Sequence, residues 1–480
     1  DRIGDSGVIG FITNSSYIDT PSMRGVRKSF FEEFNHVYVL NLRGGIRGLN
    51  GDLAKKEGQN VFDIMTGVAI CILVKDRTKD HEIHYHDIGD YLTRKEKFDI
   101  LNQAKSIFGI EWITINPDAS YDWINQRDES YHNYIPLVGE KGEQGIFNAK
   151  SVGIVSSRDC WVYGFSKNAV SNNTKRMINN YNEEVLRLSK IKDKDEKIKK
   201  INTDNSYISW SRGLKNKLIK NEKITWNSEE LVISLYRPFT KKWLYFDRNI
   251  IEMPSTFKRY LGTDNQIILI PGVGGRKDFS VFITDNVTNF TALGFASKVQ
   301  CFYRYNNEEI GELFKAYGSE SNFIDETKRQ FSLSDDEMFY YVYGLLHSKE
   351  YVHKFDSDLK KAVPRIPNVK NKDLFISVGQ KLSYLHLNYE NVAPYENVEV
   401  EFKDSEPDYR VEKMKFVSKD DKTVIRYNSS IIIKGIPEKA YDYIINGKTA
   451  IEWIMDQYQV RTDKKSGILD DPNEYSDDEK

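Results

Sequence analysis

The chain has 480 residues and a formal net charge of −2, so it is not a globally basic nucleic-acid binder, and any DNA contact must come from local patches. Apolar residues make up 39% of the sequence, which is ordinary for a folded globular protein, and the length favours about two to three domains. The three cysteines lie too far apart for a disulfide framework or a zinc knuckle. Since neither a signal peptide nor a membrane span is visible, we expect a cytoplasmic protein.

The first 88 residues alternate between strands and a helix. The run 68–74 is rich in Val and Ile but far shorter than the roughly 20 residues that cross a bilayer, so it is typical of a strand buried on both faces. Thr20 and Pro21 favour a helix start. This order predicts an α/β region, followed by a linker around 89–108. The expected elements are a buried strand at 8–13, a helix at about 22–34, and strands at 36–42, 68–74 and 82–88.

The character of the sequence changes from about residue 110, where short aromatic runs alternate with turns. These runs indicate strands at irregular spacing, and helices are expected near 174–200, 335–346 and 437–458. We interpret this as an α+β region of more than 300 residues. The charge-dense stretch at 190–200 favours a solvated helix end over a binding arm.

Several blocks carry a resemblance to a known family. The order GVIGFITNSSYI, MRGVRKSFFEEF, VYVLNLRG, NVFDIMTGVAICILVK resembles the back half of a gamma-class adenine-N6 DNA methyltransferase domain. Later blocks resemble the single-chain Type ISP restriction–modification enzymes, and the resemblance covers nearly the whole chain. These later blocks are SRDCWVYGFSKNAV, SLYRPFTKKWLYFDRN, YYVYGLLHSKEYVHKF, LKKAVPRIP, LSYLHLNYE and NGKTAIEWIMDQYQVRTDKKSGILDDPN.

The resemblance implies a fold and a domain division. Residues 1–108 would be the C-terminal part of the methyltransferase domain, a partial Rossmann-like sheet of the α/β class. Residues 109–480 would be a large α+β target-recognition domain. Because the chain starts with Asp1 and enters a strand almost at once, we expect it to be a fragment of a longer protein.

Some family motifs are absent from the sequence. The catalytic Asn-Pro-Pro-aromatic motif and the glycine-rich loop for S-adenosylmethionine are missing, and so are the helicase and nuclease motifs. The resemblance implies that S-adenosylmethionine is bound mainly by a missing N-terminal half, and that ATP and Mg act only in the full-length parent. We therefore expect this fragment alone to be inactive, with no catalytic residue of its own.

Phe62 is the leading candidate for a flipped-base pocket. An enzyme that modifies adenine must take the base out of the stack and recover part of the unstacking energy by aromatic contact. The resemblance places Phe62 at the mouth of the last β-hairpin, where the family's aromatic packs against the flipped adenine; a plain core residue is the alternative. Asn14 and Ser15, at the end of strand 8–13, are weaker candidates for the pocket wall, and loop capping is the alternative for both.

Basic residues interleaved with aromatics predict where DNA would bind. Nine basic and four acidic residues lie between 211 and 250, a pattern expected of a nucleic-acid surface. The loop at 274–278 is basic and flexible enough to reach into a groove. A turn clamp is the alternative for Arg237, and solvated loop charges are the alternative for Arg43 and Arg47. The DNA-binding candidates are Arg43, Arg47, Arg212, Arg237, Lys241, Lys242, Arg248, Arg276 and Lys277.

Other features are not assigned to function. His84 and His86 share one strand face, but two histidines without a further ligand are too few for a metal site, so we expect no metal. His347, His353 and His386 are expected to be structural. Arg158 is expected to pair with Asp159 or with a carbonyl inside the fold.

The sequence therefore predicts sequence-specific recognition of double-stranded DNA, by a monomer, within an adenine-methylating restriction–modification enzyme. A stand-alone adenine methyltransferase is one alternative, and a pure DNA specificity subunit without a motor is another. A carbohydrate-binding β-domain is compatible with the composition, but it would show no salt-dependent DNA affinity.

Overall fold

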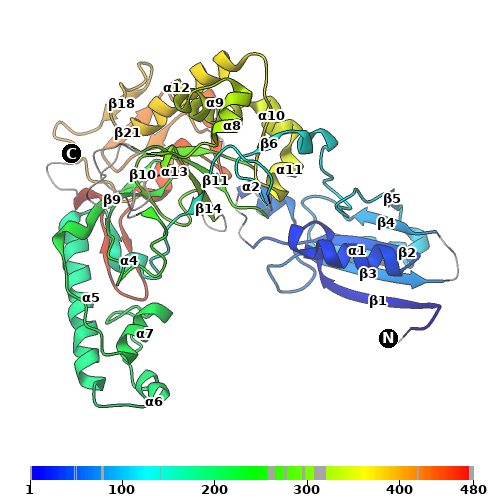
Figure 1. Ribbon diagram of the computed structural model, residues 1–480, viewed down its shortest axis with the longest axis horizontal. Helices are drawn as coiled ribbons and strands as arrows, with labels where there is room; N and C mark the ends of the chain where they lie inside the picture. The colour runs from blue at the N-terminus through cyan, green and yellow to red at the C-terminus, as the bar shows by residue number, and fades with distance from the viewer. Residues whose placement is uncertain are drawn as a thin grey trace. The chain divides into compact units, whose positions relative to one another are not determined.

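In the computed structural model, the chain folds into two compact units. Figure 1 shows their helices and strands. Unit 1 consists of Asp1–Leu137, Val273–Phe279 and Ser348–Pro367, and unit 2 contains the rest of the chain. In the part of the chain described, every helix is too short or too polar to cross a membrane. The residues described are 3–47, 49, 51–76, 80–140, 142–257, 265–274, 278–294, 298–306, 320–418 and 421–474.

Unit 1 is built on a five-stranded mixed sheet with the strand order β1-β3-β2-β4-β5. The strand β3 runs antiparallel to both β1 and β2, whereas β2 and β4 are parallel. One face of the sheet is buried against the helix α1 (Arg24–Glu33), whose Phe30 packs on the core. The strands are β1 (Gly7–Asn14), β2 (His36–Arg43), β3 (Val68–Lys75), β4 (Glu82–Asp87) and β5 (Ile113–Ile115).

Two sequence predictions for unit 1 are wrong. The strand predicted to be buried at 8–13 is the edge strand β1, and Val8 and Ile12 are 64% and 55% exposed because only β3 pairs with it. The predicted linker at 89–108 contains the helix α3 (Arg94–Ala104), which begins with a capping box between Thr93 and Glu96. Unit 1 continues past residue 108, where β5 pairs with β4.

Two later segments of the chain complete unit 1. The strand β17 pairs with β6, and the amide of Leu137 donates to the carbonyl of Pro364. The side chain of Lys361 is buried and donates to the carbonyls of Ile124 and Asn125. The further elements of unit 1 are α2 (Gly51–Lys56), β6 (Ile135–Pro136), α10 (Lys349–Lys354), α11 (Asp356–Lys361) and β17 (Arg365–Ile366).

Within the described residues, unit 2 contains three four-stranded sheets, ordered β13-β9-β10-β8, β12-β11-β14-β7 and β18-β21-β20-β19. The first two enclose a large apolar core that includes Trp161, Leu244 and Cys301. Several of the predicted aromatic runs form these strands. The strands are β7 (Ser151–Val152), β8 (Tyr163–Gly164), β9 (Leu231–Arg237), β10 (Thr240–Tyr245), β11 (Ile267–Pro271), β12 (Phe282–Thr284), β13 (Val287–Thr288), β14 (Val299–Tyr303), β18 (Glu399–Phe402), β19 (Lys415–Phe416), β20 (Ile425–Arg426) and β21 (Ile431–Lys434).

Short paired strands and short helices fill the rest of unit 2. The pairs are β15 with β16, β22 with β23, and β24 with β25. The strands are β15 (Tyr305–Asn306), β16 (Glu320–Ser321), β22 (Ile444–Ile445), β23 (Lys448–Thr449), β24 (Arg461–Thr462) and β25 (Leu469–Asp470), and the short helices are α4 (Asp159–Val162), α6 (Lys194–Lys199), α7 (Arg212–Ile219) and α8 (Asp325–Phe331).

The longer helices of unit 2 agree with the sequence in part. The helix α9 (Asp335–Leu346) has the predicted bounds, and it packs closely on α12 (Lys372–Leu387), where a Cβ on Gly344 would lie 2.1 Å from a backbone oxygen of α12. The predicted helix at 174–200 is instead α5 (Lys167–Leu188) followed by the separate α6, both visible in Figure 1. Of the predicted helix at 437–458, only α13 (Ala450–Gln457) is α-helical.

Candidate nucleic-acid interface

The strands of unit 1 present one edge at which several loops meet. The register pairs Val68 with both Asn14 and Arg43, so β1 and β2 end where β3 begins. Asn41 of β2 lies opposite Asp87, so β4 ends at the same edge. Loops at the carboxyl ends of strands are where open α/β sheets place their ligands. This edge is therefore the candidate site of unit 1.

Phe62 lies in the segment that leads into β3 at this edge. Its side chain is 49% exposed, which excludes the alternative that it is a plain core residue. The amide of Asn60 donates to the carbonyls of Gly44 and Thr66, and its Oδ1 accepts the Phe62 backbone N–H at 2.9 Å. Asn60 thus ties the loop after β2 to the Phe62 segment and presents the ring to solvent.

Other exposed apolar side chains surround Phe62. They line an open groove of about 1040 Å³ together with Arg94, which donates to Asp63. Exposed apolar residues gathered on one surface indicate a site that is covered by a ligand or a partner. These residues are Ile46, Ile64, Met65 and Tyr91.

Asn14 and Ser15 lie at the same edge of the sheet, where β1 ends. Asn14 Oδ1 accepts from the N–H and the hydroxyl of Ser16, which confirms the capping role considered for Asn14. The N–H of Ser15 donates to the carbonyl of Gly67, and Ser15 lines a polar cavity of about 400 Å³. Arg43 lines the same cavity, where it is ion-paired with Asp87 and Asp90, and Arg47 is exposed on the loop after β2.

Some of the basic residues predicted to bind DNA in unit 2 have partners inside the protein, and others are exposed. Arg237 and Lys242 are buried, and Arg237 donates to the Tyr236 carbonyl, as the turn-clamp alternative expected. Lys242 is ion-paired with Asp470, and Lys241 with Glu390. Arg212 and Arg248 are exposed and available to a ligand. Arg276 and Lys277 lie outside the described residues.

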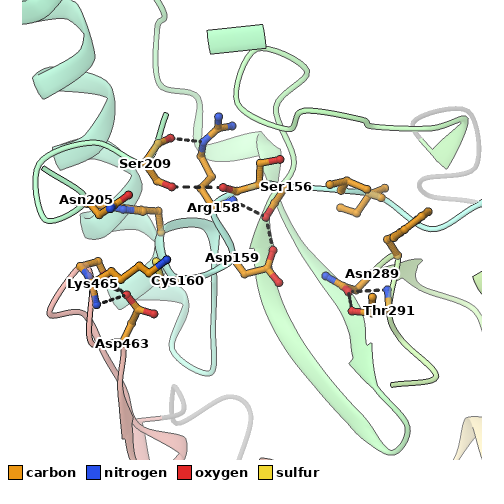
Figure 2. Close-up of a pocket in the computed structure, with 16 residues that line it drawn as sticks. Ser156, Arg158, Asp159, Cys160, Asn205, Ser209, Asn289, Thr291, Asp463 and Lys465 are labelled. Atoms are coloured by element: carbon orange, nitrogen blue, oxygen red, sulfur yellow. Dashed lines mark hydrogen bonds between the residues drawn. The ribbon is translucent and has the colours of Figure 1, made fainter. Parts of the chain in front are cut away.

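A pocket of about 390 Å³ with polar side chains in its lining opens on unit 2 (Figure 2). Three stretches line it: 154–161 around α4, 289–291 after β13, and 463–466 between β24 and β25. Asn205 and Ser209 add two further polar side chains. The lining offers both donors and acceptors, which is what recognition of a polar ligand requires.

The interior wall of the pocket is fixed by Arg158. Its guanidinium donates to the carbonyls of Ser209 and Ile250 and to the Ser211 hydroxyl, so the alternative of a carbonyl partner inside the fold is confirmed. Asp159 accepts instead from the Ser156 hydroxyl. Burial raises the pKa of the Cys160 thiol, which leaves it protonated and unactivated. The raised pKa of Cys160 makes the pocket better suited to binding than to thiol chemistry.

The loop between β24 and β25 carries two adjacent lysines, of which Lys465 lines this pocket. Asp463 Oδ1 accepts from the backbone of Lys465 and Ser466, which holds the turn, and Gly467 adopts a φ of +71°. Lys464 and Lys465 are exposed, and within the described residues neither ammonium group has an ion-pair partner. Two adjacent lysines form too short a basic run to stand out in the sequence, although the run DKKSG indicates a turn.

The histidines of α9 and α12 play the expected structural part. His386 is buried, and its Nδ1 lies 2.6 Å from the hydroxyl of Tyr343. His347 lies against it with ring centroids 5.6 Å apart, and Tyr443 stacks on both rings. His353 is exposed on α10.

These features define a mixed α/β protein of two units, with an exposed aromatic at a sheet edge in unit 1 and a pocket among the small sheets of unit 2. The family profile of the Type ISP C-terminal specificity domain matches residues 145–480. The chain therefore belongs to the Type ISP restriction–modification family, and residues 145–480 are its specificity domain.

Solved structures agree with this assignment. A nuclease-deletion mutant of the Type ISP enzyme LlaGI in complex with a DNA substrate mimic is 47% identical, with a TM-score of 0.89, and the match covers 99% of this chain and 44% of that one. The ATP-dependent Type ISP enzyme LlaBIII bound to DNA is 41% identical, with a TM-score of 0.87 and coverages of 99% and 31%. DrdV in a DNA complex is 28% identical, with a TM-score of 0.83 and coverages of 98% and 47%.

The chain spans less than half the length of each of these solved relatives. No significant match is found among curated proteins.

Proposed function

We propose that this chain recognises a short asymmetric site in double-stranded DNA and presents one adenine for N6 methylation, as part of a single-chain Type ISP enzyme. The observation that carries the proposal is the 47% identity, over 99% of the chain, to an enzyme whose solved structure contains a DNA substrate mimic. In the longer enzyme, the same recognition would license translocation and cleavage at unmethylated sites.

The sheet of unit 1 supports the methyltransferase part of this proposal. The strands β2 and β3 are antiparallel neighbours, and the segment that joins them carries the exposed Phe62, as expected for the last hairpin of a Rossmann-like methyltransferase sheet. The apolar edge strand β1 would pair with a further strand of that sheet. A pure specificity subunit would have no use for such a sheet, whereas a stand-alone methyltransferase without a motor would share it.

The proposed cofactors follow from the family. S-adenosylmethionine would be bound mainly by the portion of the enzyme that precedes this chain, because the glycine-rich loop is not in the sequence. ATP and Mg would serve only the motor and nuclease portions of the longer enzyme. The chain would act on DNA as a monomer.

The proposal is tested by selecting binders from a random duplex pool at two salt concentrations. Enrichment of one short asymmetric motif that contains an adenine is expected. If DNA is retained only at low salt and no motif is enriched, the contacts are to phosphates alone, and the specificity does not lie in these 480 residues. Absence of DNA binding at both salt concentrations would favour a non-DNA ligand such as a carbohydrate.

Replacing Phe62 by alanine is expected to slow adenine methylation by the complete enzyme about 5- to 150-fold, because stacking of a base on an aromatic ring contributes about 1–3 kcal/mol. A 2-aminopurine at the target position reports base flipping by its fluorescence, which should fall in the same variant.

Phe108→Ala is the matched control for Phe62, since Phe108 is 91% exposed in the same unit and does not line the groove. The control should methylate at the wild-type rate. Equal methylation by both variants would remove Phe62 from the base pocket.

The Lys464→Ala/Lys465→Ala double variant is expected to weaken DNA binding and to make it less dependent on salt. Each phosphate contact that is lost should lower the slope of log K against log salt by about 0.9, or about 1.8 for the pair. Fluorescence anisotropy with a labelled duplex at several salt concentrations measures the slope.

Lys190→Ala/Lys192→Ala is the charge-matched control for the lysine pair. Both control lysines are exposed in the stretch that the sequence predicts to be solvated. Their loss should leave the slope unchanged. A similar fall in slope for both double variants would show a diffuse charge effect in place of a local contact.

A further inference from the structure

Three side chains on β2 and β4 bring potential metal-ligating atoms together. His36 begins β2, and Glu82 and His84 lie two residues apart on β4, so both β4 side chains point to one face. The parallel register places His36 opposite Glu82. His36 Nδ1 lies 3.6 Å from Glu82 Oε2 and 3.5 Å from His84 Nε2, and His84 Nε2 lies 3.3 Å from Glu82 Oε2.

This triangle has the dimensions of one face of a tetrahedral metal site. Zinc bonds of about 2.0–2.1 Å to imidazole nitrogen or carboxylate oxygen imply ligand atoms about 3.4 Å apart in a tetrahedron. The three separations observed here, from 3.3 to 3.6 Å, match this value. Three protein ligands leave a fourth position for water.

The surrounding residues orient both imidazoles. The second nitrogen of His36, Nε2, lies 3.7 Å from Asp76 Oδ2, an ion-pair distance longer than a hydrogen bond, which places this carboxylate in the outer shell of the site. The ring of Tyr38 stacks on His84 with centroids 4.4 Å apart. Glu82 is 47% exposed, so an ion can reach the site from solvent.

The neighbouring histidine does not belong to this group. His86 Nδ1 lies 2.7 Å from the carbonyl of Glu111 and is engaged there. The ligand set therefore consists of His84, His36 on the adjacent strand and the carboxylate of Glu82. His86, which shares β4 with His84, is not part of it. The β4 sequence alone could not reveal this set, because His36 precedes His84 by 48 residues, and both α2 and β3 lie between β2 and β4 in the chain.

We propose that His36, Glu82 and His84 bind one first-row transition-metal dication, with zinc as the probe. Two imidazole nitrogens and one carboxylate favour Zn²⁺ or Co²⁺ over Mg²⁺ or Ca²⁺, which prefer oxygen ligands. The ion would join β2 to β4 at the end of the strand pair where His36 lies, in addition to the Arg43–Asp87 ion pair at the other end. It would thereby stabilise the sheet that carries the Phe62 groove.

The test uses the chain after removal of any affinity tag and treatment with a chelator. Isothermal titration with ZnCl₂ should give one site per chain, Co²⁺ should give the visible absorption of a tetrahedral complex, and Zn²⁺ should raise Tm. His84→Ala and Glu82→Gln remove ligands and should weaken Zn²⁺ binding by more than tenfold. Asp76→Asn should weaken it by about 10- to 100-fold through the outer shell.

His86→Ala is the matched control, because it removes a histidine of the same strand but not a ligand. It should bind Zn²⁺ and Co²⁺ as the wild type does. Glu82→Gln keeps the shape of an exposed side chain, so it separates loss of a ligand from loss of the fold. The proposal is overturned if the wild type binds no Zn²⁺, if Glu82→Gln and His84→Ala bind it unchanged, or if His86→Ala abolishes binding.

Discussion

Replacing Arg27 by methionine is expected to destabilise unit 1 by about 3–5 kcal/mol, the usual cost of breaking a buried ion pair by removing one partner. The Arg27 side chain is fully buried, and its Nη2 lies 2.6 Å from Asp122 Oδ1. The same guanidinium donates to the carbonyls of Tyr17, Thr20 and Tyr121. Methionine fills most of the volume but leaves these three carbonyls without their donor.

The location of Arg27 connects this stability to the candidate site. Arg27 joins α1 to the stretch that follows β1, directly after Asn14 and Ser15. Asp122 Oδ2 in turn lies 3.2 Å from Arg127 and 3.3 Å from Lys361. Loss of Arg27 should therefore loosen the carboxyl edge of the sheet before the rest of unit 1.

Native-state hydrogen exchange measures this effect at the amides of β2 and β3 and separates unit 1 from unit 2. Lys28→Met is the matched control, since Lys28 is exposed on the same helix and lies 3.7 Å from Glu32, a surface pair expected to contribute less than about 1 kcal/mol. If the two variants lose equal stability, the Arg27 network contributes no more than a surface pair.

The hydrophobic pattern predicted α1 and the strands β1 to β4, because their apolar residues form a helical stripe, an alternation or an unbroken run. It was wrong about the position of β1, whose Val and Ile residues suggested burial although the strand lies at a sheet edge. Edge position depends on which strands pair, and one sequence does not show pairing between distant segments. The helix α3 was missed although the capping residues Thr93 and Glu96 mark its start.

Only part of the candidate site could be predicted from the sequence. Phe62 was selected through the family resemblance, since its local pattern was equally compatible with a core residue, and its exposure agrees with the predicted role. Arg237 and Lys242 show the limit of charge counting, because both cations are turned inward and engaged with partners inside the fold. A basic residue on a strand can face either side, and burial is decided by the opposite sheet, which the local sequence does not report.

The stability of unit 2 is expected to fall as the pH drops from 7 to 5, because two histidines must stay neutral in its core. Burial lowers the pKa of His347 to about 4. Burial also lowers the pKa of His386, to about 3, and the charge of the neighbouring His347 adds to this shift. In the unfolded chain both would titrate near about 6.5. Below that pH the unfolded state binds more protons than the folded state, so the free energy of unfolding decreases. The contribution of the two neutral histidines to stability is complete above about pH 6.5 and is lost toward pH 4.

The free energy of unfolding is expected to fall by about 2 kcal/mol per histidine between pH 7 and pH 5. This is an upper value, since partial opening of the cluster to water would reduce it. Unfolding of the wild type and of His386→Asn, measured by urea titration across this range, gives the difference in slope. Asparagine can still accept from Tyr343 but cannot titrate, so the variant should depend less on pH. His353→Asn, at an exposed position, should keep the wild-type dependence, and equal slopes for all three proteins would show that His386 is protonated within the fold.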